Sequence, residues 1–164
     1  MSQRSARAQV IGLIGWLVVA FVAGGLGAVA TMDAPTFYAQ LIRPTWAPPA
    51  SIFGPVWSTL YALMATAAWL VWRSPHERRA AALALFIAQL LINATWSWLF
   101  FAWRLGALAF FDVLVLLALI AACIVYFWRI SRLSAALLAP YFAWTAFACA
   151  LTWAVWRRNP ALLG

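Results

Sequence analysis

Residues 80–103, AAALALFIAQLLINATWSWLFFAW, form a long apolar stretch without a single charged side chain. A helix needs roughly 20 such residues to cross the hydrocarbon core of a bilayer. Four more stretches of similar length and composition lie at residues 10–31, 54–72, 105–128 and 134–156. Only helices and closed barrels satisfy their backbone polar groups inside lipid. The sequence therefore predicts an all-α membrane protein, one domain over residues 1–164 built as a bundle of five transmembrane helices.

The overall composition supports a membrane protein and argues against a nucleic-acid partner. Hydrophobic residues make up 68% of the 164 residues and charged residues only 9%, whereas a soluble domain carries about 25% charged residues. The net charge is +8, but the basic residues are isolated between apolar runs and form no patch. All 11 are Arg, which suits lipid phosphates or an anionic ligand, although Arg-rich codon usage explains them equally well.

The arginine distribution predicts the orientation, because cytoplasmic loops carry an excess of basic residues. The N-terminus, the second loop and the fourth loop hold the larger group, Arg4, Arg7, Arg73, Arg78, Arg79, Arg129 and Arg132. The opposite side holds Arg43, Arg104, Arg157 and Arg158. We therefore expect the N-terminus inside and the C-terminus outside. The first apolar stretch is too long for an ordinary signal peptide, so we expect it to be retained as a helix.

The only long connection, residues 32–53, then lies on the outer face. It contains four prolines, Pro35, Pro44, Pro48 and Pro49, and the aromatic residues Phe37, Tyr38 and Trp46. Prolines favour extended and turn geometry, so this loop is expected to resist helix formation. An apolar loop of this length is expected to fold back over the helix ends like a lid; a plain interfacial loop is the alternative.

Polar and aromatic residues form a stripe on the third span. Gln89, Asn93 and Trp96 are spaced i, i+4, i+7 and share one helix face. Amides inside a span are costly when they face lipid, so these should face protein or a cavity. Hydrogen bonding between helices is the alternative role for them.

Two other spans carry matching stripes at the same depth. Trp57 and Tyr61 share a face of the second span, and Tyr141, Trp144, Ala148 and Thr152 share one on the fifth. The alternating helix directions place all three stripes beneath the long loop. They predict a pocket walled by aromatic rings, which stack well on a flat apolar ligand. Arg43 and Arg104 on the same side could receive carboxylates of an amphiphilic ligand. A core filled by large side chains is the competing interpretation.

The sequence offers little support for catalysis. It contains no nucleophile–base pair, phosphate-binding loop or metal-ligand spacing, and its one histidine, His76, lies in a charged loop. Asp112 lies within a span and has no evident charged partner there. We therefore predict no catalytic residue, no metal and no required cofactor, and we favour a non-enzymatic function.

Small residues suggest where helices approach one another closely. Ala20, Gly24 and Ala28 repeat every four residues on the first span, and Ala84 and Ala88 offer a similar face on the third. Such faces mediate close contact between membrane helices. The face on the third span is expected to serve a homodimer.

A combined pattern across most of the chain resembles the TspO/MBR family, the tryptophan-rich sensory proteins related to the mitochondrial translocator protein. The residues that carry it are Tyr38-Ala39-Gln40-Leu41, Arg43-Pro44-Thr45-Trp46, Pro48-Pro49, Gly54-Pro55-Val56-Trp57, Leu60-Tyr61, Gln89, Asn93, Trp96, Phe100-Phe101, Pro140-Tyr141, Ala143-Trp144, Trp156-Arg157 and Asn159.

The resemblance implies a five-helix bundle, commonly dimeric, that binds porphyrins such as protoporphyrin IX and haem as well as other lipophilic molecules. With the stripes above, it gives the expected ligand-binding residues as Trp46, Trp57, Tyr61, Gln89, Asn93, Trp96, Trp144, Ala148, Leu151 and Thr152. The implied function is that of a receptor or sensor in a bacterial membrane that modulates tetrapyrrole metabolism or a stress response. A porphyrin or lipid transporter, or an enzyme of light-dependent porphyrin degradation, are the alternatives.

Three positions depart from the family pattern. Trp98 replaces a usual Pro, so the end of the third span is expected to be straighter. Thr152 replaces a usual Asn, which removes an amide from the expected pocket. Trp153 occupies the region of the Tyr of the sterol motif of mitochondrial members. Such motifs are weak evidence even when intact, and we do not assign sterol binding.

Overall fold

The computed structural model describes residues 5–164 and confirms the predicted bundle. In this described part of the chain, five helices are long and apolar enough to cross a membrane. These are α1 (Ala6–Val29), α3 (Phe53–Arg73), α4 (Arg79–Ser97), α5 (Gly106–Trp128) and α6 (Arg132–Arg158). Arg4, which contributes to the orientation prediction, lies outside the described residues, and the orientation stays a prediction.

Two of the helices begin two or more residues earlier than the apolar pattern predicts, because a serine caps each. The Ser5 hydroxyl accepts a hydrogen bond from the Ala8 N–H at 3.3 Å, at the start of α1. The Ser131 hydroxyl does the same for the Ser134 N–H at 3.3 Å, at the start of α6. A capped first turn is stable although its residues are polar.

The expectation that residues 32–53 resist helix formation is wrong for part of the loop. It contains the short helix α2 (Ala34–Gln40) and the 3-10 turn η1 (Ala50–Ile52). Pro35 occupies the first turn of α2, where a missing N–H costs no hydrogen bond and the fixed φ favours the helix. Pro160 opens the terminal helix α7 (Pro160–Leu163) in the same way.

The end of the third span is irregular, and the expectation that it is straighter than in the family stays a prediction. Regular α-helix ends at Ser97 and continues as the π-helical turn η2 (Trp98–Ala102). The Trp103 N–H donates to the Trp98 carbonyl at 2.8 Å, five residues back. Trp98 is therefore the first residue of an irregular turn that a backbone hydrogen bond closes. π-Turns of this kind are frequent at functional sites.

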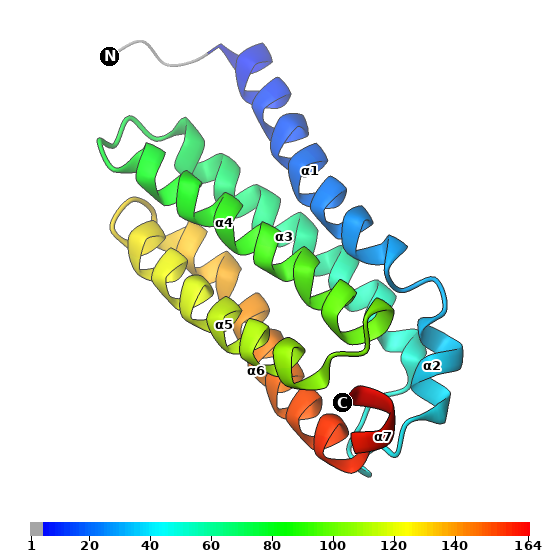
Figure 1. Cartoon of the computed structure of the whole chain (residues 1–164). Helices are drawn as coiled ribbons and strands as arrows, with labels where there is room; N and C mark the ends of the chain where they lie inside the picture. Colours follow the sequence, from blue (N-terminus) through cyan, green and yellow to red (C-terminus); the bar gives the residue numbers. More distant parts are fainter. Residues whose placement is uncertain (1–4) are drawn as a thin grey trace.

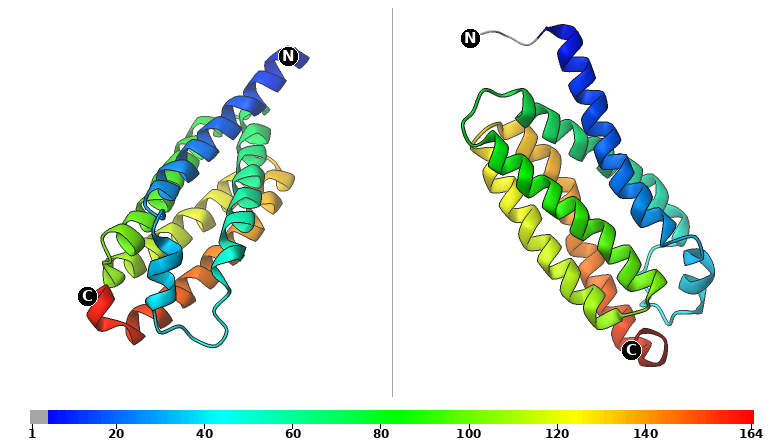
Figure 2. Two further views of the ribbon diagram at one scale, coloured as in Figure 1. Left: turned by 90° about the vertical axis from the view of Figure 1, so that its right-hand side faces the viewer. Right: turned by 45° about the horizontal axis from the view of Figure 1, so that its top comes forward.

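The five long helices form a closed ring. α1 packs against α3 and α4, α3 also packs against α6, and α5 lies between α6 and α4. Figure 1 shows the N-terminal end of α1 and the α3–α4 and α5–α6 loops at one end of the bundle, and α2 and α7 at the other. Both views in Figure 2 show the connection between α1 and α3 (residues 32–53, the first loop) and the C-terminus together at this second end.

The small-residue face of α1 makes contacts inside the chain. Ala20 is fully buried, and a Cβ added to Gly24 would lie 2.6 Å from the Tyr61 ring. This part of α1 therefore lies close against α3, as its spacing predicts. Ala84 and Ala88 on α4 are exposed, so that face remains available and the homodimer stays a prediction.

Candidate ligand-binding site

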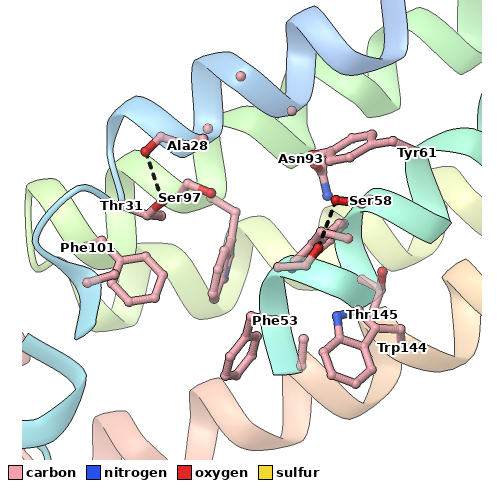
Figure 3. A pocket seen from close by; sticks show the side chains of 18 of the residues that line it. Ala28, Thr31, Phe53, Ser58, Tyr61, Asn93, Ser97, Phe101, Trp144 and Thr145 are labelled. Atoms are coloured by element: carbon pink, nitrogen blue, oxygen red, sulfur yellow. Dashed lines mark hydrogen bonds between the residues drawn. The ribbon is translucent and has the colours of Figure 1, made fainter. Parts of the chain in front are cut away.

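A cavity of about 520 Å³ lies inside the ring of helices at the α2 end (Figure 3). Small-molecule sites commonly measure roughly 300–1,000 Å³. Residues from all five long helices line it, and so do residues of α2, η1 and η2. On each long helix the lining begins near the middle and continues only toward the α2 end. The hollow is thus confined to one half of the bundle.

Six of the expected ligand-binding residues line this cavity together. They are Trp57, Tyr61, Asn93, Trp96, Trp144 and Ala148. They come from α3, α4 and α6, the three spans whose stripes were predicted to converge. Figure 3 shows Asn93 beside Tyr61 and Trp144 across the open space from α1.

Four other expected residues do not line the cavity. Leu151 and Thr152 are buried on α6, beyond the lining residues. Gln89 is 1% exposed and accepts a hydrogen bond from the Tyr141 hydroxyl at 2.7 Å, so it takes the helix-to-helix role that was the alternative. Trp46 is 50% exposed on the first loop, edge-on to Phe147.

The two arginines considered for ligand carboxylates contact aromatic rings of the first loop and do not line the cavity. The guanidinium of Arg43 is 4.7 Å from the centre of the Tyr38 ring, and that of Arg104 is 4.8 Å from the Phe37 ring. Burial raises the pKa of Tyr38, and Arg43 opposes that rise. The Tyr38 hydroxyl therefore remains a donor at neutral pH.

The polar groups at the cavity are few and include unpaired ones. The Tyr61 hydroxyl donates to Oδ1 of Asn93 at 2.7 Å. Nε1 of Trp96 and Oγ1 of Thr145 are buried and have no hydrogen-bond partner among residues 5–164. Thr66 and Thr95, by contrast, bond back to carbonyls four residues earlier. An unmet buried donor is costly, and a ligand acceptor at this cavity would relieve that cost.

Ring contacts fix the aromatic walls. Trp96 stacks on Phe100 with ring centres 5.3 Å apart and planes at 12°. Trp144 contacts Phe147 at 5.4 Å and meets Phe53 edge-on at 5.9 Å. Each such pair contributes about 0.5–1.5 kcal/mol beyond burial. The walls are therefore held in place by their neighbours as well as by their helices.

The end of the cavity is covered by the first loop. The Tyr38 hydroxyl donates to the Pro48 carbonyl at 3.1 Å, which ties α2 to the rest of the loop. The Asn159 side chain holds the loop to the end of α6. It accepts from the Ile42 N–H at 2.8 Å and donates to the Ile42 and Val155 carbonyls at 3.0 and 2.7 Å. The position of the loop over the cavity follows from these contacts.

The lining from α1 was not predicted. Gly24, Gly25, Gly27 and Ala28 border the cavity, together with Phe21 earlier on α1 and Thr31 just after the helix. The glycines and Ala28 carry neither aromatic rings nor amides, so the sequence patterns that identified the other walls did not apply to them, and Phe21 was not singled out. The run of glycines was the available signal, because glycine inside a helix needs a packing or functional reason.

The chemistry of the site is that of a binding cavity. Within residues 5–164 no group of three His, Cys, Asp or Glu side chains could hold a metal ion. His76 lies in the α3–α4 loop at the opposite end of the bundle. Asp112 is half-buried on α5 and is not among the lining residues. Aromatic surface with a few hydrogen-bonding groups is what remains at the cavity.

Fold and cavity together define a multi-pass integral membrane protein with a small-molecule-sized cavity inside its helix bundle. Residues 16–157 match the model of the TspO/MBR family. The chain belongs to this family, as its sequence motifs indicate.

Individual relatives agree with this assignment. The chain is 40% identical to a translocator protein of Homo sapiens over 126 residues, 75% of each chain. It is 36% identical to protein CrtK of Rhodobacter capsulatus over 147 residues, which is 88% of this chain and 91% of that protein. A tryptophan-rich protein TspO of Chlorobaculum tepidum is 30% identical over 126 residues, 76% of this chain and 80% of the relative.

Proposed function

We propose that the protein is a membrane receptor that binds a porphyrin, with protoporphyrin IX or haem as the ligand, and modulates tetrapyrrole metabolism or a stress response. The observation that carries this proposal is the cavity of about 520 Å³ bordered by Trp57, Trp96 and Trp144. Indole rings stack on a flat conjugated macrocycle at little conformational cost, because their orientation is already fixed.

The hydrogen-bonding groups are consistent with such a ligand. Asn93, Trp96 and Thr145 give the cavity a small polar surface within an apolar wall, and small-molecule sites typically use a few such groups to orient a ligand. The carboxylates of a porphyrin could extend toward Arg43 and Arg104 only past the first loop, because neither arginine lines the cavity.

A through-path for transport receives less support. A transporter needs access from both sides of the membrane, whereas the residues that line this cavity lie at one end of the bundle. The other half of the ring is filled by side chains such as Phe86 and Phe127, which are fully buried and stacked 6.1 Å apart. A receptor that binds its ligand within one half of the membrane fits this distribution better.

Titration with protoporphyrin IX, followed by quenching of tryptophan fluorescence in detergent, tests the proposal. We expect saturable quenching of the wild-type fluorescence. The double variant Trp57→Ala/Trp144→Ala should bind at least about a hundredfold more weakly, since stacking of one planar ring on one aromatic side chain is worth roughly 1–3 kcal/mol. Trp103→Ala/Trp128→Ala is the matched control, because both rings are more than half exposed and lie outside the cavity. Equal affinity of the two double variants would refute the site.

A further inference from the structure

We propose that the ligand enters and leaves the cavity sideways, directly from the lipid hydrocarbon, through an opening between α1 and α3. This inference deepens the proposed function and rests on the cavity being the ligand site. The lateral opening is defined by cavity-lining residues that are also exposed on the surface of the bundle. They are Phe21, Gly25 and Ala28 on α1, Gly54 and Ser58 on α3, and Pro35 and Ala50 in the first loop.

The exposure of the lining residues is strongly one-sided. The lining residues of α4, η2, α5 and α6 are all buried or half-buried. Asn93, Val113 and Thr145, for example, are only 5%, 2% and 1% exposed. The cavity is therefore closed toward these helices and open only along α1, α2 and the start of α3.

Close contacts bound the opening toward both ends of the bundle. On one side, Gly24 lies so close to the Tyr61 ring that a Cβ there would be 2.6 Å away. On the other side the first loop covers the cavity, where Tyr38 is 6% exposed and packs edge-on against Phe53 at 5.7 Å. Access from the water phase at the loop end is therefore blocked by buried side chains, whereas the space between α1 and α3 is not.

Two residues at the opening, Gly25 and Gly54, are small although nothing packs against them in the described structure. Small residues in membrane helices normally mark close helix contact. Apart from the adjacent residues and the backbone of the same helix turn, no described atom lies within 4 Å of the position that a Cβ would take on Gly25 or on Gly54. The absence of side chains at these two positions thus leaves an open space beside the cavity.

The opening is apolar and lies within the membrane-spanning part of the chain. Gly25 and Ala28 fall inside the span Ala6–Val29, and Gly54 and Ser58 inside the span Ala50–Arg73. The Ser58 hydroxyl donates to the Gly54 carbonyl at 3.0 Å (Figure 3), so it presents no free donor to lipid. A ligand using this route must dissolve in the bilayer, so the class of ligand is a lipophile delivered through the membrane phase.

The first test needs no ligand of the protein. A small apolar aryl diazirine dissolved in the bilayer is photolysed in vesicles that contain the protein, and labelled residues are found by mass spectrometry. We expect labelling at Thr145, which is buried and lines the cavity. Gly25→Phe should reduce this labelling by about tenfold, because its ring fills the opening.

Gly15→Phe is the matched control for that variant. Gly15 is on the same helix, is also exposed and has nothing packed against its Cβ position, but it does not line the cavity. A second pair on α3 repeats the test from the other side of the opening. Ser58 and Thr59 are adjacent, exposed and both bonded back to carbonyls, yet only Ser58 lines the cavity. Equal labelling of Thr145 in Ser58→Phe and Thr59→Phe, and in both glycine variants, would overturn the proposal.

The second test measures the route of a bound ligand. Protein in lipid nanodiscs is loaded with protoporphyrin IX and mixed with excess empty discs, and release is followed by recovery of tryptophan fluorescence. Transfer between protein-free discs is measured separately. We expect Gly25→Phe to slow both loading and release about tenfold relative to Gly15→Phe, because an obstructed route slows entry and exit together.

The outcomes separate the two proposals. If wild type does not bind protoporphyrin IX, the proposed function fails, while the diazirine result still decides whether the lateral opening exists. If it binds, but Asn159→Ala speeds release and Gly25→Phe leaves it unchanged, the ligand passes the first loop and the lateral route is refuted.

Discussion

The two halves of this helix ring use similar residues in opposite ways. At the end that holds the α3–α4 loop, which we call the packed end, Gly12 lies against the Trp72 ring, and the Trp69 indole donates to the Gln9 carbonyl at 2.9 Å. At the α2 end, the hollow end, Gly25 faces open space and Trp96 has a buried indole N–H without a described partner.

Side-chain size accounts for much of this difference. Ala65, Ala67 and Ala68 on α3 are fully buried at the packed end, where they allow the neighbouring helices to approach. At the hollow end α3 carries Trp57 and Tyr61 at the corresponding positions, and their rings contact one another at 5.6 Å. Both rings border the cavity rather than fill it, so the aromatic residues of this half line a hollow instead of forming a filled core.

The largest contrast between the halves should come from adding the same ring to each. Ala68→Phe inserts a ring into a fully buried position of the packed end and should destabilise the fold by about 1–3 kcal/mol or more. Ala148→Phe places the ring at the cavity and should leave stability nearly unchanged while it lowers the affinity for protoporphyrin IX at least about tenfold, since it occupies ligand volume.

Thermal unfolding in detergent, followed by circular dichroism, compares the two variants, and the fluorescence titration measures binding. Similar losses of stability in both would contradict the distinction between a packed and a hollow end. Retained affinity in Ala148→Phe would show that the ligand does not use this part of the cavity.

The next contrast concerns how the hollow end is covered. Asn159→Ala removes both hydrogen bonds to Ile42, each worth about 0.5–1.5 kcal/mol. Hydrogen exchange of the Ile42 amide should accelerate by about tenfold, because roughly 1.4 kcal/mol of local protection is lost. Exchange in the middle of α3 should not change. Arg158→Ala is the control, since its guanidinium bonds only within α6 at 3.0 Å.

These regions also differ in how well the sequence predicts them. The five spans follow from length and apolar composition alone, because lipid leaves a chain few alternatives. The convergence of Trp57, Asn93 and Trp144 follows from helix periodicity combined with alternating helix direction. Both are consequences of regular geometry, and the structure agrees with both.

The parts that were not predicted depend on contacts between distant residues. Gln89 and Asn93 share a helix face, yet Gln89 bonds to Tyr141 and lies outside the cavity lining. Helix spacing places a residue on a face but does not determine how neighbouring helices fill the space before it. The anchoring of the first loop by Asn159 joins residues 117 positions apart and has no local signature in the sequence.

A smaller effect should distinguish two adjacent glycines at the boundary between the halves. Gly24→Ala places a Cβ 2.6 Å from the Tyr61 ring and should destabilise the fold, whereas Gly25→Ala meets open space. Alanine in a helix interior is favoured over glycine by roughly 0.5–1 kcal/mol, so Gly25→Ala should raise the unfolding temperature slightly. Thermal unfolding followed by circular dichroism measures the stability of both variants. A gain in stability for Gly24→Ala would show that α1 can move away from α3 without cost.

The smallest expected effects come from removing the hydroxyl groups of two tyrosines that make equivalent hydrogen bonds. Tyr61 and Tyr141 each donate to an amide oxygen at 2.7 Å, but only Tyr61 lines the cavity. Losing such a bond between membrane helices costs about 0.6 kcal/mol on average, so Tyr61→Phe and Tyr141→Phe should lower stability by similar small amounts.

Ligand binding should separate these two variants. Tyr61→Phe frees Oδ1 of Asn93, which lines the cavity, and should change the affinity for protoporphyrin IX by about threefold, the size expected for one weak polar contact. Tyr141→Phe leaves Gln89 without its donor, away from the lining, and should leave that affinity unchanged. If both variants alter binding equally, loss of the Tyr141–Gln89 hydrogen bond affects ligand binding in the cavity from a distance. The packed and hollow ends would then be energetically coupled, and the boundary between them would be less sharp than the burial of these side chains implies.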